Sequence, residues 1–136
     1  MKIILVRYGE YREGHLNDQG KKTMKLASEC LKPLVQESSA IICANIPRAI
    51  ESAQIIAQEL RIGPIQIFTG LYAAEESGIE INLDTALKII DTVGQDKDIV
   101  VAVVSREYIQ ALSKYFGQPD AVLSRGEILI LPYFRK

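Results

Sequence analysis

Three short apolar runs, each followed closely by an arginine, constrain the fold of this chain most strongly. The runs and their arginines are residues 3–6 with Arg7, residues 41–43 with Arg48, and residues 99–104 with Arg106. Short runs rich in β-branched residues are typical of strands buried on both faces of a parallel sheet. The carboxyl ends of parallel strands meet at one edge, where open α/β sheets bind their ligands. We therefore expect the three arginines to gather at one edge of the sheet.

Helical patterns fill the intervals between these runs. Apolar residues recur at helical spacing in four segments, residues 20–35, 48–60, 84–93 and 107–116. Asn17, Asp18 and Asp84 offer capping side chains, and Pro47 suits a first helical turn. Further strands are expected at residues 65–68 and 127–131, and residues 99–104 should be the central strand. This alternation predicts a three-layer α/β/α fold with a mostly parallel central sheet, in one domain spanning residues 1–136.

The composition is that of an ordinary globular domain. The chain has 136 residues, of which 48% are apolar and 24% charged, and its formal net charge is −1. This charge provides no field that would attract nucleic acid or an acidic membrane, so any anion site must be local. No segment reaches the length of a membrane span, and neither a cofactor nor a metal site is expected.

The two cysteines indicate core packing rather than a disulfide framework. Cys30 falls on the apolar side of the first predicted helix, and Cys43 ends a predicted strand. The apolar run before Arg7 is too short for a signal peptide. We expect a reducing, cytoplasmic compartment. The sequence does not indicate an oligomeric state.

Arginines that share one sheet edge suit an anionic ligand. The guanidinium fork matches phosphate or carboxylate oxygens two at a time. One charge pair at about 4 Å and an effective dielectric of about 20 is worth about 4 kcal/mol before desolvation. The alternative is that each arginine forms an ordinary surface ion pair, with partners among Glu10, Glu13, Glu51 and Glu107. The shared position after apolar strands favours the anion site.

Four motifs resemble one known family. They are the opening MKIILVRYGE, HLNDQG at residues 15–20, ANIPRAIESA at residues 44–53, and VVSR at residues 103–106. Their order and spacing resemble those of the histidine phosphatase superfamily, also called phosphoglycerate mutase-like proteins, where Arg-His-Gly follows the first strand. The length is similar to that of the short phosphohistidine phosphatases. The likeness extends over nearly the whole chain and implies the fold of that superfamily.

The resemblance also implies a chemistry from which this chain departs. In the family, a first histidine accepts the phosphoryl group, while two arginines and a second histidine hold its oxygens. Imidazole suits this work because it is largely neutral and nucleophilic near neutral pH. Here the arginines correspond to Arg7 and Arg48, Tyr8 stands at the nucleophile position, and Arg106 stands at the second histidine's position. The resemblance therefore implies a pocket that holds phosphate without transferring it, with Tyr8 as a wall or hydrogen-bond donor.

Four further residues are candidates for the pocket. Glu75 and Glu76 lie where the family carries its proton donor, although the family's Leu-x-Glu spacing falls on Ala73; the alternative is a solvated acidic loop. His15, the only histidine, could reach over the pocket or remain solvated. Arg12 could reach the pocket mouth or remain on the surface.

Three functions follow from these residues. The favoured one is a catalytically degenerate phosphatase-like protein that binds phosphate or a phosphorylated small molecule or protein. The second is an active phosphatase with an atypical nucleophile, Tyr8 or His15. The third is an interaction protein with a relic pocket, in which glutamates neutralise the arginines.

Overall fold

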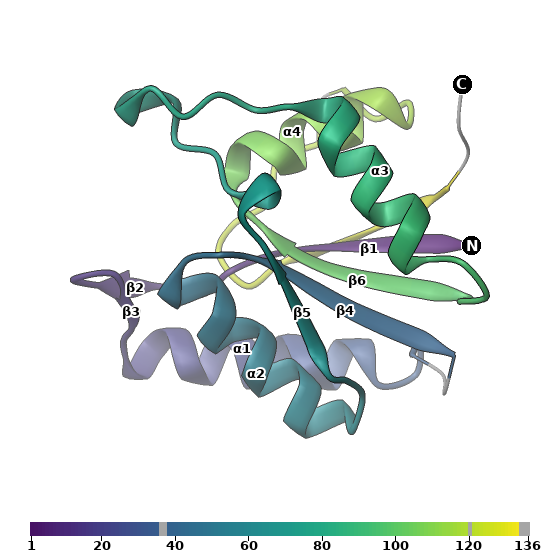
Figure 1. Ribbon diagram of the computed structural model, residues 1–136. Coiled ribbons are helices and arrows are strands. Elements are labelled where there is room, and N and C mark those ends of the chain that lie inside the picture. Colours follow the sequence, from purple (N-terminus) through teal and green to yellow (C-terminus); the bar gives the residue numbers. More distant parts are fainter. Residues whose placement is uncertain (36–37, 120, 134–136) are drawn as a thin grey trace.

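The computed structural model describes residues 1–35, 38–119 and 121–133, and these form a three-layer α/β/α fold (Figure 1). A five-stranded sheet has the order β5-β4-β6-β1-β7. The strands are β1 (Lys2–Arg7), β4 (Ser39–Ala44), β5 (Ile65–Phe68), β6 (Ile99–Val104) and β7 (Ile128–Pro132). Helices α1 (Asp18–Leu31) and α2 (Pro47–Leu60) cover one face, and α3 (Leu83–Val93) and α4 (Arg106–Tyr115) cover the other. The predicted layers are confirmed.

The sheet is mostly parallel, as predicted, and β6 is its central strand. β6 pairs in parallel with both β1 and β4, and β4 pairs in parallel with β5. Only β7 runs antiparallel, beside β1. Every residue of β4 and β6 is buried, which explains why both strands read as continuous apolar runs rather than as alternating patterns.

Side-chain caps set the starts of two helices. Asn17 caps α1, where its side-chain oxygen accepts a hydrogen bond from the Gly20 amide at 2.8 Å. The assignment of Asp84 as the cap of α3 is wrong. Asn82 accepts from the Thr85 amide at 3.0 Å instead, so Asp84 lies inside the first turn. The side-chain oxygen of the residue directly before a helix can accept a hydrogen bond from a free N–H group of the first turn. Asp84 cannot do this because it lies within that turn.

The two cysteines differ in environment. Cys43 is buried on β4, as predicted, and burial raises the pKa of its thiol to about 11. The prediction that Cys30 packs in the core is wrong, because Cys30 is exposed. The buried stripe of α1 consists of Met24, Ala27, Ser28 and Leu31 besides Gly20. Cys30 lies beside this stripe rather than on it.

A short hairpin replaces part of the irregular loop expected after β1. β2 (Tyr11–Arg12) pairs antiparallel with β3 (His15–Leu16). The two residues between them, Glu13 and Gly14, have φ angles of 54° and 86°, as a two-residue hairpin turn of this hand requires. The hairpin fixes Tyr11 close to the end of β1. Among the described residues, no helix is long and apolar enough to cross a membrane.

Two glycines let α1 lie directly on the backbone that follows β1. A Cβ at Gly9 would lie 2.7 Å from the Gly20 carbonyl oxygen, and a Cβ at Gly20 would lie 2.0 Å from the Glu10 carbonyl oxygen. Neither position has room for a side chain. This contact holds the segment that carries Tyr8.

Substituting Gly20 tests this contact. We expect Gly20→Ala to lower the free energy of unfolding by about 1–3 kcal/mol or more, because its methyl group overlaps a backbone carbonyl. The matched control is Lys22→Ala, an exposed change on the same helix, with an expected effect within about 0.5 kcal/mol. Urea denaturation measures both. Equal stability of the two variants would contradict the close packing.

Candidate functional site

The three predicted arginines begin at one edge of the sheet. Arg7 is the last residue of β1 and lies opposite Val104, the last residue of β6. Arg106 begins α4 after β6, and Arg48 is the second residue of α2, which follows β4. Since β4, β6 and β1 are neighbouring parallel strands, their carboxyl ends bring these three backbone positions to the same edge.

Arg7 is held by the loop that precedes β7. Its Nη1 donates to the Leu123 carbonyl at 2.8 Å. Its own carbonyl accepts from the Gly126 amide at 2.8 Å, and its amide donates to the Glu127 carbonyl at 3.1 Å. The loop therefore lies against the end of β1.

Arg48 packs on two tyrosine rings. Its Cζ lies 5.0 Å from the Tyr8 ring centroid and 4.2 Å from that of Tyr11. The two rings meet edge to face with centroids 5.8 Å apart, and Tyr8 is buried. Arg125 also lies over the Tyr11 ring, at 4.9 Å. Aromatic faces attract cations through their quadrupole, so the rings gather two guanidinium groups.

Arg48 stays charged although it is partly buried. Burial opposes its charge, but hydrogen bonding to Tyr8, Coulombic interaction with Tyr8 and Tyr11, and hydrogen bonding to Tyr72 together raise its pKa. Its Nε is buried and has no hydrogen-bond partner among the described residues.

Ser105 provides a second unpartnered polar atom at this edge. It lies between β6 and α4 and is 2% exposed, and its Oγ has no hydrogen-bond partner among the described residues. A buried polar group left without a partner costs about 1–3 kcal/mol. Two such groups, on Arg48 and Ser105, lie near the carboxyl edge of the sheet.

Of the three arginines, Arg106 alone has a carboxylate partner in the part of the chain that the structure describes. Arg106 pairs with its neighbour Glu107, with Nε and Oε1 3.5 Å apart and the Arg106 side chain 58% exposed. For Arg106 the structure thus contains the ordinary ion pair considered above as an alternative. Within the described part of the chain, neither Arg7 nor Arg48 has a carboxylate within the 4.0 Å of an ion pair.

His15 is tied to α2. Its Nδ1 lies 2.7 Å from Oε2 of Glu51, and the Leu16 amide donates to Oε1 of the same carboxylate at 2.8 Å. The imidazole is 63% exposed. Burial opposes the charge of Glu51, but hydrogen bonds from His15 and Leu16, and the charges of His15 and Lys21, lower its pKa.

The remaining candidates lie on the surface. Arg12 is exposed on β2, and Glu75 and Glu76 are exposed in the short 3-10 helix Glu75–Ser77. Glu75 and Glu107 line the same cavity of about 540 Å³ beside α4. The structure thus brings Glu75 to the neighbour of Arg106 rather than to Arg7 or Arg48.

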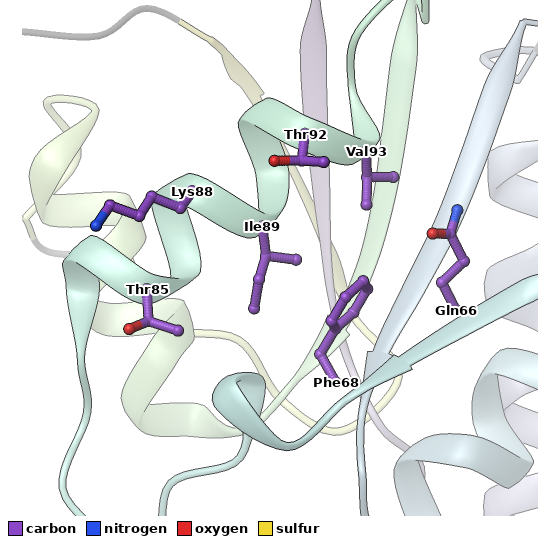
Figure 2. Close-up of a pocket in the computed structure, with 7 residues that line it drawn as sticks. All are labelled: Gln66, Phe68, Thr85, Lys88, Ile89, Thr92 and Val93. Atoms are coloured by element: carbon purple, nitrogen blue, oxygen red, sulfur yellow. The ribbon is translucent and has the colours of Figure 1, made fainter.

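A second cavity of about 540 Å³ lies between α3 and β5 (Figure 2). Gln66 and Phe68 of β5 line it together with Thr85, Lys88 and Ile89 of α3, and Figure 2 shows Ile89 on the side of α3 that lies towards Phe68. None of the predicted site residues lines this cavity.

Sequence reasoning missed Tyr11 and Arg125. Tyr11 was part of a loop without periodicity, and the hairpin turn at Glu13-Gly14 was its only available signal. Arg125 lies in a segment between α4 and β7 whose position depends on hydrogen bonds to Arg7. No local pattern encodes those bonds.

Comparison with known proteins agrees with the predicted fold. No family model matches the chain. Serine/threonine-protein phosphatase Pgam5 of Drosophila ananassae, described as mitochondrial, is 30% identical over 84 residues, which cover 57% of this chain. The chain spans only 29% of the length of that relative.

Solved structures match over nearly the whole chain. The protein histidine phosphatase SixA complexed with tungstate has a TM-score of 0.77 at 14% identity, covering 96% of this chain and 86% of that one. Mycobacterial glucosyl-3-phosphoglycerate phosphatase Rv2419c, complexed with VO3, has a TM-score of 0.72 at 15% identity, covering 96% and 92%. Phosphoserine phosphatase of Entamoeba histolytica, in complex with 3-phosphoglyceric acid, has a TM-score of 0.67 at 18% identity, covering 95% and 89%. The fold of this chain is that of the phosphoglycerate mutase-like phosphatases.

The Glu51 contacts predict a pH-dependent stability. Because the pKa of Glu51 lies below its ordinary value of 4.5, its ionised form stabilises the fold above that value and the contribution is lost as the pH falls through the lowered pKa. Thermal unfolding should show Glu51→Gln less stable than the unaltered protein at about pH 6, with the gap narrowing towards about pH 3.

The control for this measurement is Glu76→Gln, an exposed change without these contacts, which should alter stability little at either pH. If Glu51→Gln and the unaltered protein differ in Tm by the same amount at about pH 6 and at about pH 3, the charge of the Glu51 carboxylate contributes nothing to stability.

Proposed function

We propose that this chain binds phosphate, or the phosphate group of a phosphorylated small molecule or protein, at the carboxyl edge of its sheet and does not transfer the phosphoryl group. The binding residues are Arg7, Arg48 and Arg106, with Tyr8 as wall or hydrogen-bond donor. The observation that carries the proposal is the pair of buried, unpartnered polar atoms at this edge, Nε of Arg48 and Oγ of Ser105. A phosphate oxygen accepts from both types of group.

The charges at this edge favour an anion. Arg7 and Arg48 have no carboxylate partner within the described residues. Their partners there are the Leu123 carbonyl, tyrosine rings and tyrosine hydroxyls, which do not cancel a full positive charge. The Arg106–Glu107 pair is exposed, and such pairs are worth about 0–1 kcal/mol. Arg106 can therefore turn to a bound anion at small cost. The first N–H groups of α4, which begins at Arg106, add donors of the kind that bind phosphate.

The structural neighbours support this class of ligand. SixA was solved with tungstate and Rv2419c with VO3. Tungstate resembles phosphate in shape and charge, and VO3 is a vanadium oxyanion with three oxygens. We extend this preference for oxyanions to the present chain because its Arg7 and Arg48 follow the corresponding strands.

The residues beside the arginines argue against phosphoryl transfer. A phenol with a pKa of about 10 is mostly protonated at neutral pH and is a poor nucleophile. Tyr8 packs against Arg48, and the only histidine is bonded to Glu51. Within the described residues the His15 imidazole has no hydrogen bond to Tyr8 or to the three arginines, so we infer that it neither attacks phosphorus nor accepts the Tyr8 proton. Loss of a nucleophile costs on the order of 10⁴–10⁶ in rate.

Anion binding is tested by thermal shift and calorimetric titration with inorganic phosphate, sulfate and tungstate. At a phosphate concentration of 100 times Kd the protein should gain about 2.7 kcal/mol of stability. Arg48→Ala should abolish this gain. The charge-matched control is Lys97→Ala, an exposed lysine just before the amino end of β6, which should preserve it. No shift at millimolar anion would refute phosphate binding and favour an interaction protein with a relic pocket.

Catalytic loss is tested by restoring the two histidines. The unaltered protein should show no turnover of aryl phosphates or phosphohistidine peptides above background. The double variant Tyr8→His with Arg106→His should gain activity and form an acid-labile phosphoenzyme, because it regains an attacking imidazole. Native turnover that disappears in Tyr8→Phe would overturn the proposal and establish the tyrosine as nucleophile.

A further inference from the structure

The loop at residues 123–127 is fixed beside the proposed site. Besides its bonds to Arg7, it closes on itself, since the Ser124 amide donates to Oε1 of Glu127 at 2.6 Å. Gly126 lies so close to α1 that a Cβ there would be 2.1 Å from Cγ2 of Thr23. The loop is therefore held by β1 on one side and α1 on the other, and it presents Arg125 at a defined place.

The Tyr11 ring contacts the guanidinium groups of both Arg125 and Arg48. The two Cζ atoms lie 4.9 Å and 4.2 Å from the centroid of the same ring, so they are at most about 9 Å apart. Like charges at this distance repel each other. One tetrahedral oxyanion, which accepts charge-assisted hydrogen bonds on several oxygens, can contact both groups.

Arg125 has no ion-pair partner among the residues that the structure describes. The three ion pairs of the described residues involve His15, Lys32 and Arg106. The nearest carboxylate along the chain, on Glu127, accepts from Ser124 instead, and these hydrogen bonds lower its pKa. Arg48 and Arg125 thus share the Tyr11 ring, and Arg7 is hydrogen-bonded to the loop that carries Arg125. We call these three residues the cationic cluster.

We propose that Arg125 is a further anion-binding residue beside Arg7, Arg48 and Arg106, positioned by Tyr11, and that it makes the site selective for divalent over monovalent oxyanions. This inference rests on the proposed function and adds a residue that has no counterpart among the four sequence motifs. The mutual repulsion of three guanidinium groups is relieved more by two negative charges than by one. Removing Arg125 should therefore weaken divalent anions most.

Calorimetric titration with sulfate and with nitrate tests the proposal. Arg125→Ala should weaken sulfate binding by about tenfold or more, the usual effect of losing a hydrogen bond to a charged group. It should also reduce the ratio of sulfate to nitrate affinity. The matched control is Arg12→Ala, which removes the same charge from the residue after Tyr11, where the side chain is exposed. It should change sulfate affinity less than about twofold.

Two further measurements separate binding from packing. Arg125→Lys, which keeps the charge but not the fork, should fall between the unaltered protein and Arg125→Ala in sulfate affinity. If Arg125 only packs on Tyr11, Arg125→Ala will lower Tm without anion and leave sulfate affinity and selectivity unchanged.

The outcomes also separate this inference from the proposed function. Sulfate affinity that is lost in Arg48→Ala but equal in Arg125→Ala and Arg12→Ala would overturn the role of Arg125 and leave the oxyanion site intact. Absence of phosphate and sulfate binding by the unaltered protein would overturn both.

Discussion

Parallel pairing of β1 and β4 with the central strand β6 is the constraint on which the site depends. It places Arg7 opposite Val104 and Cys43 opposite Val103, so the polar residues that follow the three strands start at one level. A shift of one residue would turn the side chains of a strand to the opposite face of the sheet. Because β4 and β6 are buried along their whole length, such a shift is strongly disfavoured, and the edge is as well defined as the core.

The positive charge that collects at this edge is balanced without carboxylates, except at Arg106. Arg7 donates to a carbonyl, while Arg48 and Arg125 lie over tyrosine rings. These partners carry partial negative charge, so they stabilise the guanidinium groups without cancelling them. Two carboxylates that could cancel them are held by other donors, Glu51 by His15 and Leu16 and Glu127 by Ser124. A chain with a net charge of −1 thereby keeps a local cationic cluster.

Strands and helices that leave a periodic pattern could be predicted from the sequence. Features that depend on contacts between distant segments could not. Continuous apolar runs identified β6 as the central strand and placed the three arginines after parallel strands, because burial on both faces leaves a clear pattern. The exposure of Cys30 was not predicted, because Cys30 lies directly beside the buried stripe of α1. At the edge of an apolar stripe, one position along the helix decides whether a side chain is buried or exposed. Arg125 was missed because hydrogen bonds between residues far apart in the chain, such as Arg7 and Gly126, position its loop. The roles of the arginines in binding remain predictions.

Under the proposed function, Tyr8 and Arg106, which stand at the two histidine positions of the family motifs, act in the same direction on the site. A tyrosine in place of the nucleophile removes a neutral attacking nitrogen, but its ring and hydroxyl interact with Arg48 and help to raise the pKa of that guanidinium. An arginine in place of the second histidine removes a group that can exchange a proton and adds a permanent cation. Under the proposed function both changes lower the capacity for phosphoryl transfer, and the arginine also raises the positive potential at the edge. The proposed binding groups lie on β1, α2 and α4, so a change at the nucleophile position alone leaves most of them in place.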